Sequence, residues 1–299
     1  MINNQILNGK TLAATIKGEI ANEVSLYTAR GLRPPRMVVI LVGDDAPSQT
    51  YVNSKEKTSL EIGFTSSVIH LPETATEDEL LGVIYRLNND YSVDGFIVQL
   101  PLPKHLNEKK ILHAIAAEKD VDGFTPHNTG LMALGEETYL PPNIMGVCTM
   151  FERYNINSDG KHCVIVGSSN IACSPTATLL SSNSKHANCT ITICNYRTAN
   201  LADLTRQADI LIVDIGKPNF ITADMVKEGV VLIDVGIHRI PDPTRPNGYH
   251  LTGDVDHAEV DKLCSWYTPV PGGVGPMTII SLLQNTMKAY KKKFSLGDF

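Results

Sequence analysis

The stretch Ser48-Gln-Thr-Tyr51-Val-Asn-Ser-Lys55-Glu-Lys57 decides the fold predicted for the first half of the chain. It follows an apolar run, Met37-Val-Val-Ile-Leu-Val42, and a turn, Gly43-Asp-Asp-Ala-Pro47. The run is rich in β-branched residues, which predicts a buried strand. Ser48 is predicted to cap a helix that continues to about Ile62 and stops at the following glycine.

Tyr51 and Lys55 are four residues apart, so they share one face of the predicted helix. That face lies beside the carboxyl end of the preceding strand, where open α/β sheets bind small ligands. A lysine shielded from water can lose its proton near neutral pH and act as a base. A lysine on a helix is more commonly a solvated charge, so the spacing alone does not establish catalysis.

Composition excludes several classes of function. The 299 residues carry a net charge of −6, which argues against a nucleic-acid-binding surface, and no apolar run reaches membrane-spanning length. The first ten residues lack the pattern of a secretory signal. None of the six cysteines forms a C-x-x-C pair, so we expect buried thiols in a reduced cytoplasm and no metal site.

Two further segments of the first half carry polar residues at chain turns. A predicted strand over 93–98 ends at Gln99, at the same sheet edge as the start of the Tyr51/Lys55 helix. A Gln in that position either hydrogen-bonds a ligand or simply pairs with backbone groups that the strand leaves without a partner. The run Lys119-Asp-Val-Asp122-Gly123 predicts a turn that aims a carboxylate into a cleft, although an ordinary Asx turn explains it equally well.

The second half repeats a strand–turn–helix rhythm that is typical of a nucleotide-binding α/β domain. Strands are predicted at 162–167, 189–194, 209–213 and 230–235. Gly167-Ser168-Ser169 does not complete a G-x-G-x-x-G motif, yet a dinucleotide can still lie on the helix amino terminus there. The Pro/Gly-dense run 267–277 is predicted to be neither strand nor helix, and a helix is predicted from about Thr278 to Lys291.

Four stretches together resemble the bifunctional methylenetetrahydrofolate dehydrogenase/cyclohydrolase family over nearly the whole chain. They are Ser48-Gln-Thr-Tyr51-x-x-x-Lys55, Gly95-Phe-Ile-Val-Gln-Leu-Pro-Leu-Pro103, Lys119-Asp-Val-Asp-Gly-Phe124 and Thr268-Pro-Val-Pro-Gly-Gly-Val-Gly-Pro-Met-Thr278. The resemblance implies oxidation of methylenetetrahydrofolate with NADP, followed by hydrolysis of the methenyl product to formyltetrahydrofolate.

The resemblance also implies roles for individual residues. Lys55 would be the catalytic lysine, Tyr51 would pack on the folate, and Gln99 would position Lys55. Asp122 would hydrogen-bond the pterin ring, Ser48 would belong to the substrate site, and the loop Pro271-Gly272-Gly273 would close over the folate. The cofactor would contact Gly167, Ser168, Ser169, Tyr196, Arg197 and Ile237.

The cofactor half departs from the family pattern. Ser168 replaces the usual Arg that pairs with the ribose phosphate of NADP, and Cys173 replaces a Gly. Asn143-Ile144-Met145-Gly146 replaces the usual Thr-Pro-x-Gly, Tyr196 replaces a Ser, and Asp214 stands where a small residue is usual. Arg197 is a candidate substitute for the lost phosphate contact, and NAD is a second candidate cofactor.

The resulting prediction is a two-domain α/β enzyme of the cytoplasm, with its cleft between the domains. Residues 1–143, completed by 275–299, would bind folate, and 144–274 would form a Rossmann-like NAD(P) domain. The family implies a homodimer. The alternatives are a cyclohydrolase with a weakened or lost dehydrogenase and a non-catalytic folate-binding paralogue. The latter is the less favoured, because binding alone does not need Lys55.

The serine at position 168 predicts weaker NADP binding and less discrimination against NAD. A Ser offers one neutral hydrogen bond to the ribose phosphate, whereas an Arg forms a bidentate charged pair. Ser168→Arg should therefore tighten NADP binding about 5- to 150-fold, with little change for NAD. Dissociation constants of both cofactors for both proteins test this, and tight, selective NADP binding by the unsubstituted protein would contradict it.

Overall fold

The computed structural model describes residues 4–167, 173–184, 187–246 and 248–297. The chain divides into two compact units. One contains the residues up to Ala13 together with Asn143–Thr278, and the other contains Ala14–Pro142 together with the residues from Ile279 onward. Within the described ranges, no helix has the length and apolar character needed to cross a bilayer.

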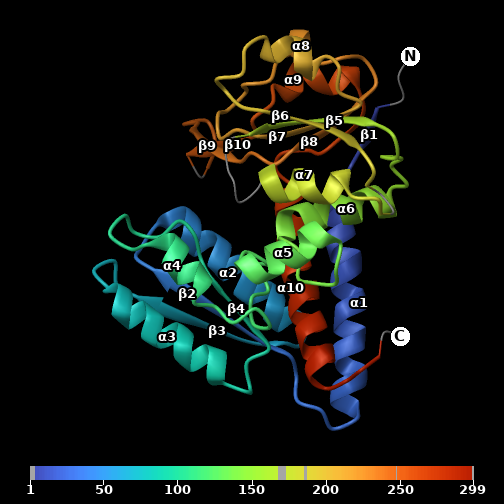
Figure 1. Ribbon diagram of the computed structural model, residues 1–299. Coiled ribbons are helices and arrows are strands. Elements are labelled where there is room, and N and C mark those ends of the chain that lie inside the picture. The colour runs from blue at the N-terminus through green and yellow to red at the C-terminus, as the bar shows by residue number, and fades with distance from the viewer. Residues whose placement is uncertain (1–3, 168–172, 185–186, 247, 298–299) are drawn as a thin grey trace. The chain divides into compact units, whose positions relative to one another are not determined.

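The unit of Ala14–Pro142 is built on a parallel sheet of three strands in the order β3-β2-β4. Val39 of the central strand pairs with Val68 on one side and Ile97 on the other. The elements follow the predicted strand–helix alternation (Figure 1): β2 Arg36–Val42, α2 Ala46–Glu61, β3 Thr65–Leu71, α3 Glu77–Asn89, β4 Gly95–Val98, α4 Glu108–His113 and α5 Pro126–Leu134.

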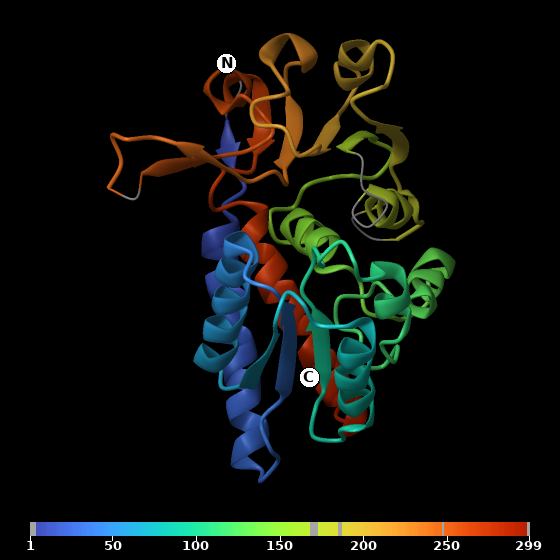
Figure 2. The same ribbon diagram turned by 90° about the vertical axis from the view of Figure 1, so that its left-hand side faces the viewer.

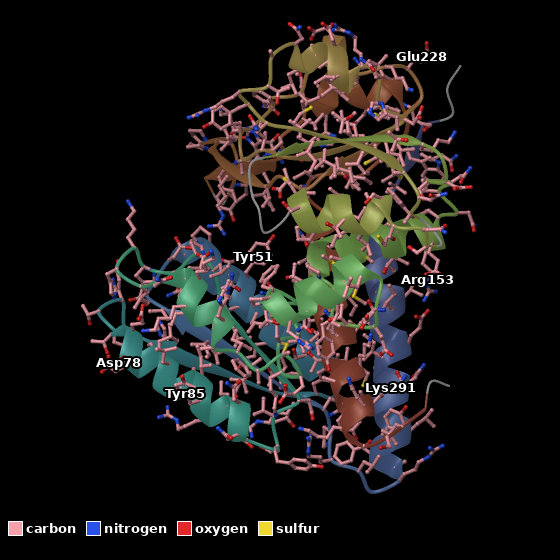
Figure 3. All side chains as sticks on the ribbon, in the orientation of Figure 1. Tyr51, Asp78, Tyr85, Arg153, Glu228 and Lys291 are labelled. Atoms are coloured by element: carbon pink, nitrogen blue, oxygen red, sulfur yellow. The ribbon has the colours of Figure 1, made fainter. Side chains whose placement is uncertain are left out.

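Both faces of this sheet are covered, which explains its continuous apolar strands. Val38, Ile40 and Val42 pack with Phe96 and the apolar faces of α3 and α4. The opposite face is covered by α2 together with α1 (Gly9–Ala29) and α10 (Val274–Lys293), and the last two helices run side by side (Figures 1 and 2). Two contacts join these helices: the rings of Tyr27 and Tyr290 lie 6.0 Å apart, and Lys291 pairs with Glu23 at 2.9 Å (Figure 3).

The other unit is a parallel sheet of six strands in the order β1-β11-β8-β7-β5-β6. Helices α8 and α9 cover one face of this sheet, and α6 and α7 cover the other (Figure 1). Its elements are β1 Gln5–Ile6, α6 Pro142–Arg153, β5 His162–Gly167, α7 Cys173–Ser181, β6 Thr190–Cys194, α8 Leu201–Thr205, β7 Ile210–Asp214, β8 Val230–Asp234, α9 His257–Val260 and β11 Cys264–Tyr267. An antiparallel hairpin, β9 His238–Pro241 with β10 Tyr249–Thr252, is attached.

The sequence did not predict β1, β11 or the hairpin. β1 has two residues and β11 has four, which is too short to show a repeating pattern. The pairing of these short strands nevertheless connects parts of the chain that are far apart in the sequence. β11 pairs in parallel with β8 and with β1, which joins the start of the chain to the second half.

Three predicted helix ends are corrected. Asp45, not Ser48, caps α2: its carboxylate accepts from the Ser48 backbone N–H at 2.9 Å, so Ser48 lies one turn inside the helix. The sequence from Glu108 to Ala117 predicts a short helix, but α4 ends at His113, four residues earlier. α10 begins at Val274, inside the run predicted to be irregular, because Pro276 falls in the first turn, where its missing N–H costs nothing.

Asp94 ties the last turns of α10 to the three-stranded sheet. Its side chain is fully buried and accepts two hydrogen bonds of 2.7 Å from Arg33, one of 2.8 Å from the Arg36 backbone N–H, and one of 3.1 Å from Lys293. A buried carboxylate is tolerated only when donors surround it in this way. The arrangement therefore fixes where the C-terminal helix ends on its unit.

Removing this carboxylate should destabilise the unit strongly. Asp94→Ala leaves Arg33 and Lys293, both partly shielded, without their shared anion, and we expect a loss of about 2–3 kcal/mol in the free energy of unfolding. Urea unfolding of both proteins measures this difference in the free energy of unfolding. Asp78→Ala, on the exposed start of α3, is the matched control and should have almost no effect. Equal stability of the two variants would contradict the assignment.

Candidate active site

Lys55 is buried on the third turn of α2, with 8% of its surface exposed. Its Nζ donates a hydrogen bond of 2.9 Å to Oε1 of Gln99, the residue that follows β4. The Gln99 Nε2 donates to the Leu100 carbonyl oxygen at 2.7 Å. The two bonds fix the orientation of the amide, so that its oxygen faces the lysine. The structure thus brings together two residues 44 positions apart, as the predicted shared sheet edge requires.

Burial lowers the pKa of Lys55, and the charge of Asp122 partly opposes that shift. Desolvation penalises the ammonium form, since the charged group loses its water without gaining a full ion pair. A larger fraction of neutral amine is therefore present near neutral pH than for a solvated lysine. A neutral amine in this position can take a proton from water or from a reacting group.

Tyr51 lies one helical turn before Lys55 and extends from α2 as a half-buried side chain (Figure 3). Burial raises the pKa of its hydroxyl, so the ring stays an uncharged phenol. Its flat face is suited to packing on a planar ligand. Ser48 is also buried, but its hydroxyl donates to Asp45 at 2.7 Å, which gives it a part in capping the helix.

Asp122 belongs to the same electrostatic group as Lys55. Burial raises the pKa of its carboxyl to about 6, against the lowering effect of Lys55, and the nearby Asp120 raises it further. Gly123 follows with φ +68°, and a Cβ there would lie 2.4 Å from the Tyr139 carbonyl oxygen, so only glycine fits this turn. The predicted turn is therefore confirmed, and the charge of its carboxylate acts on Lys55.

Two residues that sequence reasoning missed hold this turn. Asn285, buried on α10, donates to the carbonyl oxygens of Val121 and Leu140, each at 2.8 Å. Asp120 accepts from the Thr125 backbone N–H at 2.8 Å and from Asn128 at 2.9 Å. The available signal was an Asn among the residues of α10 that pack inward, because a buried amide needs partners.

The loop Pro271-Gly272-Gly273 lies directly before α10. The Gly272 carbonyl oxygen accepts from the Lys10 backbone N–H at 2.8 Å, and a Cβ on Gly9 would overlap the Gly273 carbonyl oxygen. The start of α1 therefore holds this loop in place through close backbone contact. Closure of the loop over folate remains a prediction.

The carboxyl edge of the six-stranded sheet has the geometry of a dinucleotide site. β6 and β7 lie on opposite sides of β5, so the strand order reverses between β5 and β7, and ligands bind at such switch points. Gly167 ends β5 opposite Asp214 of β7. A Cβ on Gly167 would lie 2.3 Å from the Cys173 Sγ, which explains the glycine. Ser168 and Ser169 lie outside the described residues.

Cations gather around Tyr196, just past the end of β6. The Lys217 Nζ lies 5.0 Å from the centre of its ring, and the Arg197 guanidinium carbon lies 5.4 Å away. Arg197 was predicted from the sequence and Lys217 was not, since 21 residues separate Lys217 from Tyr196. Ile237, also predicted, follows β8 and is 45% exposed. In this fold class, the end of the second strand is where the adenosine ribose is recognised.

Asp254 sets the position of Lys217. Its buried carboxylate accepts from the backbone N–H groups of Ile215, Gly216 and Lys217 at 2.8, 3.1 and 2.8 Å. His238 Nε2 lies 2.7 Å from the same carboxylate. The Asp254 side chain therefore fixes the conformation of the loop after β7 and links that loop to β9.

A pocket at the same edge collects three of the positions that depart from the family pattern. Asn143, Cys173 and Asp214 line it with Thr176 and with apolar side chains of α6, β5, β7 and the residue after β8, namely Ile144, Val147, Ile165, Ile212 and Val235. Asp214 is half-buried, and burial together with Asp254 and Asp234 raises the pKa of its carboxyl. These three positions thus line one pocket, although they are scattered along the sequence.

Comparison with known proteins identifies the family. The family model for the catalytic domain of tetrahydrofolate dehydrogenase/cyclohydrolase matches residues 7–122, and the model for its NAD(P)-binding domain matches 141–294. The chain belongs to this family. It is 50% identical over 285 residues to the bifunctional protein FolD of Cytophaga hutchinsonii, covering 95% of this chain and 98% of that protein. It is 49% identical over 287 residues to the Porphyromonas gingivalis FolD, covering 96% and 97%.

Solved structures of family members have the same fold. The bifunctional FolD enzyme of Campylobacter jejuni is 46% identical, with a TM-score of 0.90, over 96% of this chain and 99% of that one. The Trypanosoma brucei enzyme, solved with NADP and an inhibitor, is 33% identical with a TM-score of 0.91, over 96% and 97%. These similarities support the bifunctional interpretation rather than a chain that has lost one activity. Among the described residues, no group of three or more His, Cys, Asp and Glu side chains is arranged to hold a metal ion.

The coupling between Lys55 and Asp122 predicts a reciprocal pKa change. Because the Lys55 charge lowers the pKa of Asp122, Lys55→Met should raise that pKa above about 6. Carboxyl carbon chemical shifts followed by NMR against pH measure it. Lys57→Met, at an exposed position of the same helix, is the control and should leave the titration of Asp122 unchanged. The same pKa in all three proteins would show that the two groups do not interact.

Proposed function

We propose that this FolD family member carries out both reactions of its family through Lys55, with Tyr51, Gln99 and Asp122 completing the catalytic site. It oxidises methylenetetrahydrofolate to methenyltetrahydrofolate and hydrolyses that product to 10-formyltetrahydrofolate. The observation that carries the proposal is the buried amine of Lys55, bonded to Gln99 at 2.9 Å and coupled electrostatically to Asp122. All four residues lie in one unit and were identified from the sequence.

The oxidation removes a hydride from the one-carbon unit, which becomes a cationic methenyl carbon. NADP supplies the hydride acceptor when it is bound. The protein's contribution is to hold the folate and to avoid a second fixed positive charge beside the developing cation. Burial lowers the pKa of Lys55, so its amine loses its charge more readily than a solvated lysine and meets that need, while Asp122 accepts hydrogen bonds from the N–H donors of the pterin ring.

The hydrolysis adds water to the methenyl carbon. The Lys55 amine takes a proton from the attacking water, and the new carbon–oxygen bond neutralises the cation. Breakage of one carbon–nitrogen bond then gives the formyl product, with the proton passing to the departing nitrogen. Gln99 holds the amine in place, and its orientation is fixed by its own bond to Leu100.

The cofactor is proposed to bind along the carboxyl edge of the six-stranded sheet. Gly167, Ser168 and Ser169 would approach its phosphates. Tyr196 would stack on the adenine, while Arg197 and Lys217 would meet the ribose phosphate in place of the family's arginine. Ile237 would contact the nicotinamide half. In this proposal, residues 1–143 with 275–299 bind folate, with Ser48 and 271–273 in the substrate site, and 144–274 bind the dinucleotide.

We also propose that the protein acts as a homodimer in the cytoplasm. The family resemblance supports the dimer, and the six cysteines support a reducing compartment, since five are buried and no disulfide joins any pair of them. Light scattering on the purified chain tests the first proposal.

The activity of Lys55 can be separated from folate binding. Lys55→Met should reduce hydrolysis of added methenyltetrahydrofolate by about 100- to 10,000-fold, because the general base is removed. Folate affinity should change little, since Asp122 remains. The absorbance of the methenyl compound follows the hydrolysis without cofactor, and its formation from methylenetetrahydrofolate with NADP follows the oxidation. Lys57→Met is the matched control. Normal hydrolysis by Lys55→Met would refute the assignment.

A further inference from the structure

His257, the first residue of α9, has a carboxylate against each nitrogen of its ring. Nε2 lies 3.0 Å from Oδ2 of Asp234, at the end of β8, and Nδ1 lies 2.7 Å from Oδ1 of Asp261, in the short turn that follows α9. Carboxylates only accept hydrogen bonds when ionised, and a neutral imidazole carries a single N–H. Both contacts are hydrogen bonds only when the ring is an imidazolium, so this geometry makes His257 a cation.

The carboxylate on one side of that cation is enclosed by backbone. The Asp234 side chain has no exposed surface. Its Oδ1 accepts from the Gly236 and Asp254 N–H groups at 2.9 and 3.1 Å, and its Oδ2 accepts from the Val255 N–H at 3.0 Å. A Cβ on Gly253 would lie 1.9 Å from that Oδ2, so the chain closes directly on the carboxylate. Among the residues that the structure describes, the imidazolium is its one cationic partner.

These bonds set the backbone at the carboxyl edge of the six-stranded sheet. Gly236 belongs to the loop after β8, and Asp254 and Val255 follow β10. Asp254 in turn holds the backbone of 215–217, after β7, with its own carboxylate. A series of contacts therefore runs from the His257 ring to the loops after β7 and β8, which border the proposed dinucleotide site.

We propose that His257 is a positioning residue for the dinucleotide: its positive charge keeps Asp234 in place, and Asp234 keeps the loops after β7 and β8 in the conformation that binds the cofactor. The inference rests on the proposed dinucleotide site and assigns to His257 no contact with the cofactor. Loss of the charge leaves a buried carboxylate without its cation, which is strongly unfavourable. The loops then leave the binding conformation in part of the population, and the apparent affinity falls with that fraction.

The dependence on this charge should appear in alkaline solution. Burial lowers the pKa of His257, but hydrogen bonds with Asp234 and Asp261 raise it from 6.5 to about 9. Because the folded-state pKa is the higher one, the contribution of the charge is complete below pH 6.5 and is lost as the pH rises through about 9.

The other titratable groups around the ring keep their charge state in that range. The carboxylates of Asp234 and Asp261 belong to a class that titrates in acid. Tyr267 of β11 has its ring centre 6.4 Å from that of His257, and burial, Asp261 and Cys264 raise the pKa of its hydroxyl. Burial raises the pKa of Cys264 on the same strand to about 12. A change of affinity near pH 9 thus reports on the imidazole.

The experiment follows binding of NADPH and NADH to the whole chain by isothermal titration calorimetry between pH 7.5 and 10. NADH lacks the ribose phosphate, so titration of the proposed phosphate contacts does not affect its binding. For the unsubstituted protein, both dissociation constants should be steady up to about pH 8 and should rise on the order of tenfold as the pH passes 9.

Asp261→Asn separates the charge of His257 from the fold, because Asp261 is partly exposed. Removing this anion lowers the pKa of His257, so the rise in both dissociation constants should begin about one pH unit lower. His257→Gln keeps a donor for Asp234 without the charge. Its affinity at pH 7.5 should be weaker on the order of tenfold, with no further change through pH 9. Glu259→Gln, at an exposed carboxylate of α9 that pairs with Lys262, is the matched control and should keep the original profile.

Three results would overturn the inference while leaving the dinucleotide site intact. They are a steady affinity of the unsubstituted protein through pH 10, an unmoved midpoint in Asp261→Asn, and an unchanged profile in His257→Gln. If His257→Gln does not fold, Asp261→Asn decides alone. If the unsubstituted protein binds neither dinucleotide at pH 7.5, the proposed site itself is wrong, and the inference fails with it.

Discussion

The desolvation of one lysine is the constraint on which the catalytic unit depends. A buried amine stays functional only if its environment neither neutralises it permanently nor pairs it fully with an anion. Gln99 supplies a neutral acceptor at 2.9 Å, and Asp122 supplies a charge that acts on Lys55 with no direct hydrogen bond between the two side chains. The lysine can therefore exchange a proton during the reaction.

That balance needs rigid support, which comes from residues that take no part in the proposed chemistry. Asn285 and Asp120 hold the turn that carries Asp122, and the positive φ of Gly123 completes that turn. The cost of burying these polar groups is offset by hydrogen bonds, because each has its partners within the unit. The site is consequently built into the packing of α10 on its sheet, and Asp94 anchors the end of the same helix.

In the dinucleotide unit, buried carboxylates also hold loops in place by accepting hydrogen bonds from backbone N–H groups. Asp234 accepts from the backbone N–H groups of Gly236, Asp254 and Val255, and Asp254 in turn accepts from 215–217. Although burial lowers the pKa of His257, hydrogen bonds with Asp234 and Asp261 raise it to about 9, so its charge partly compensates Asp234. The loops after β7 and β8 are thus fixed before any cofactor binds. The uncompensated carboxylate at this edge is Asp214, as far as the described residues show.

The sequence by itself determined the strand–helix alternation, the Tyr51/Lys55 face, the position of Gln99 and the turn of Asp122, because each depends on local periodicity or turn chemistry. It also identified the departures at Asn143, Cys173 and Asp214, but only one at a time. Tertiary structure decided that these three line one pocket and that Lys217 lies beside Tyr196, because strand order in a sheet brings together residues that are distant along the chain. It likewise decided the pKa shifts of Lys55 and Asp122, since burial and the distance between charges exist only in the folded chain.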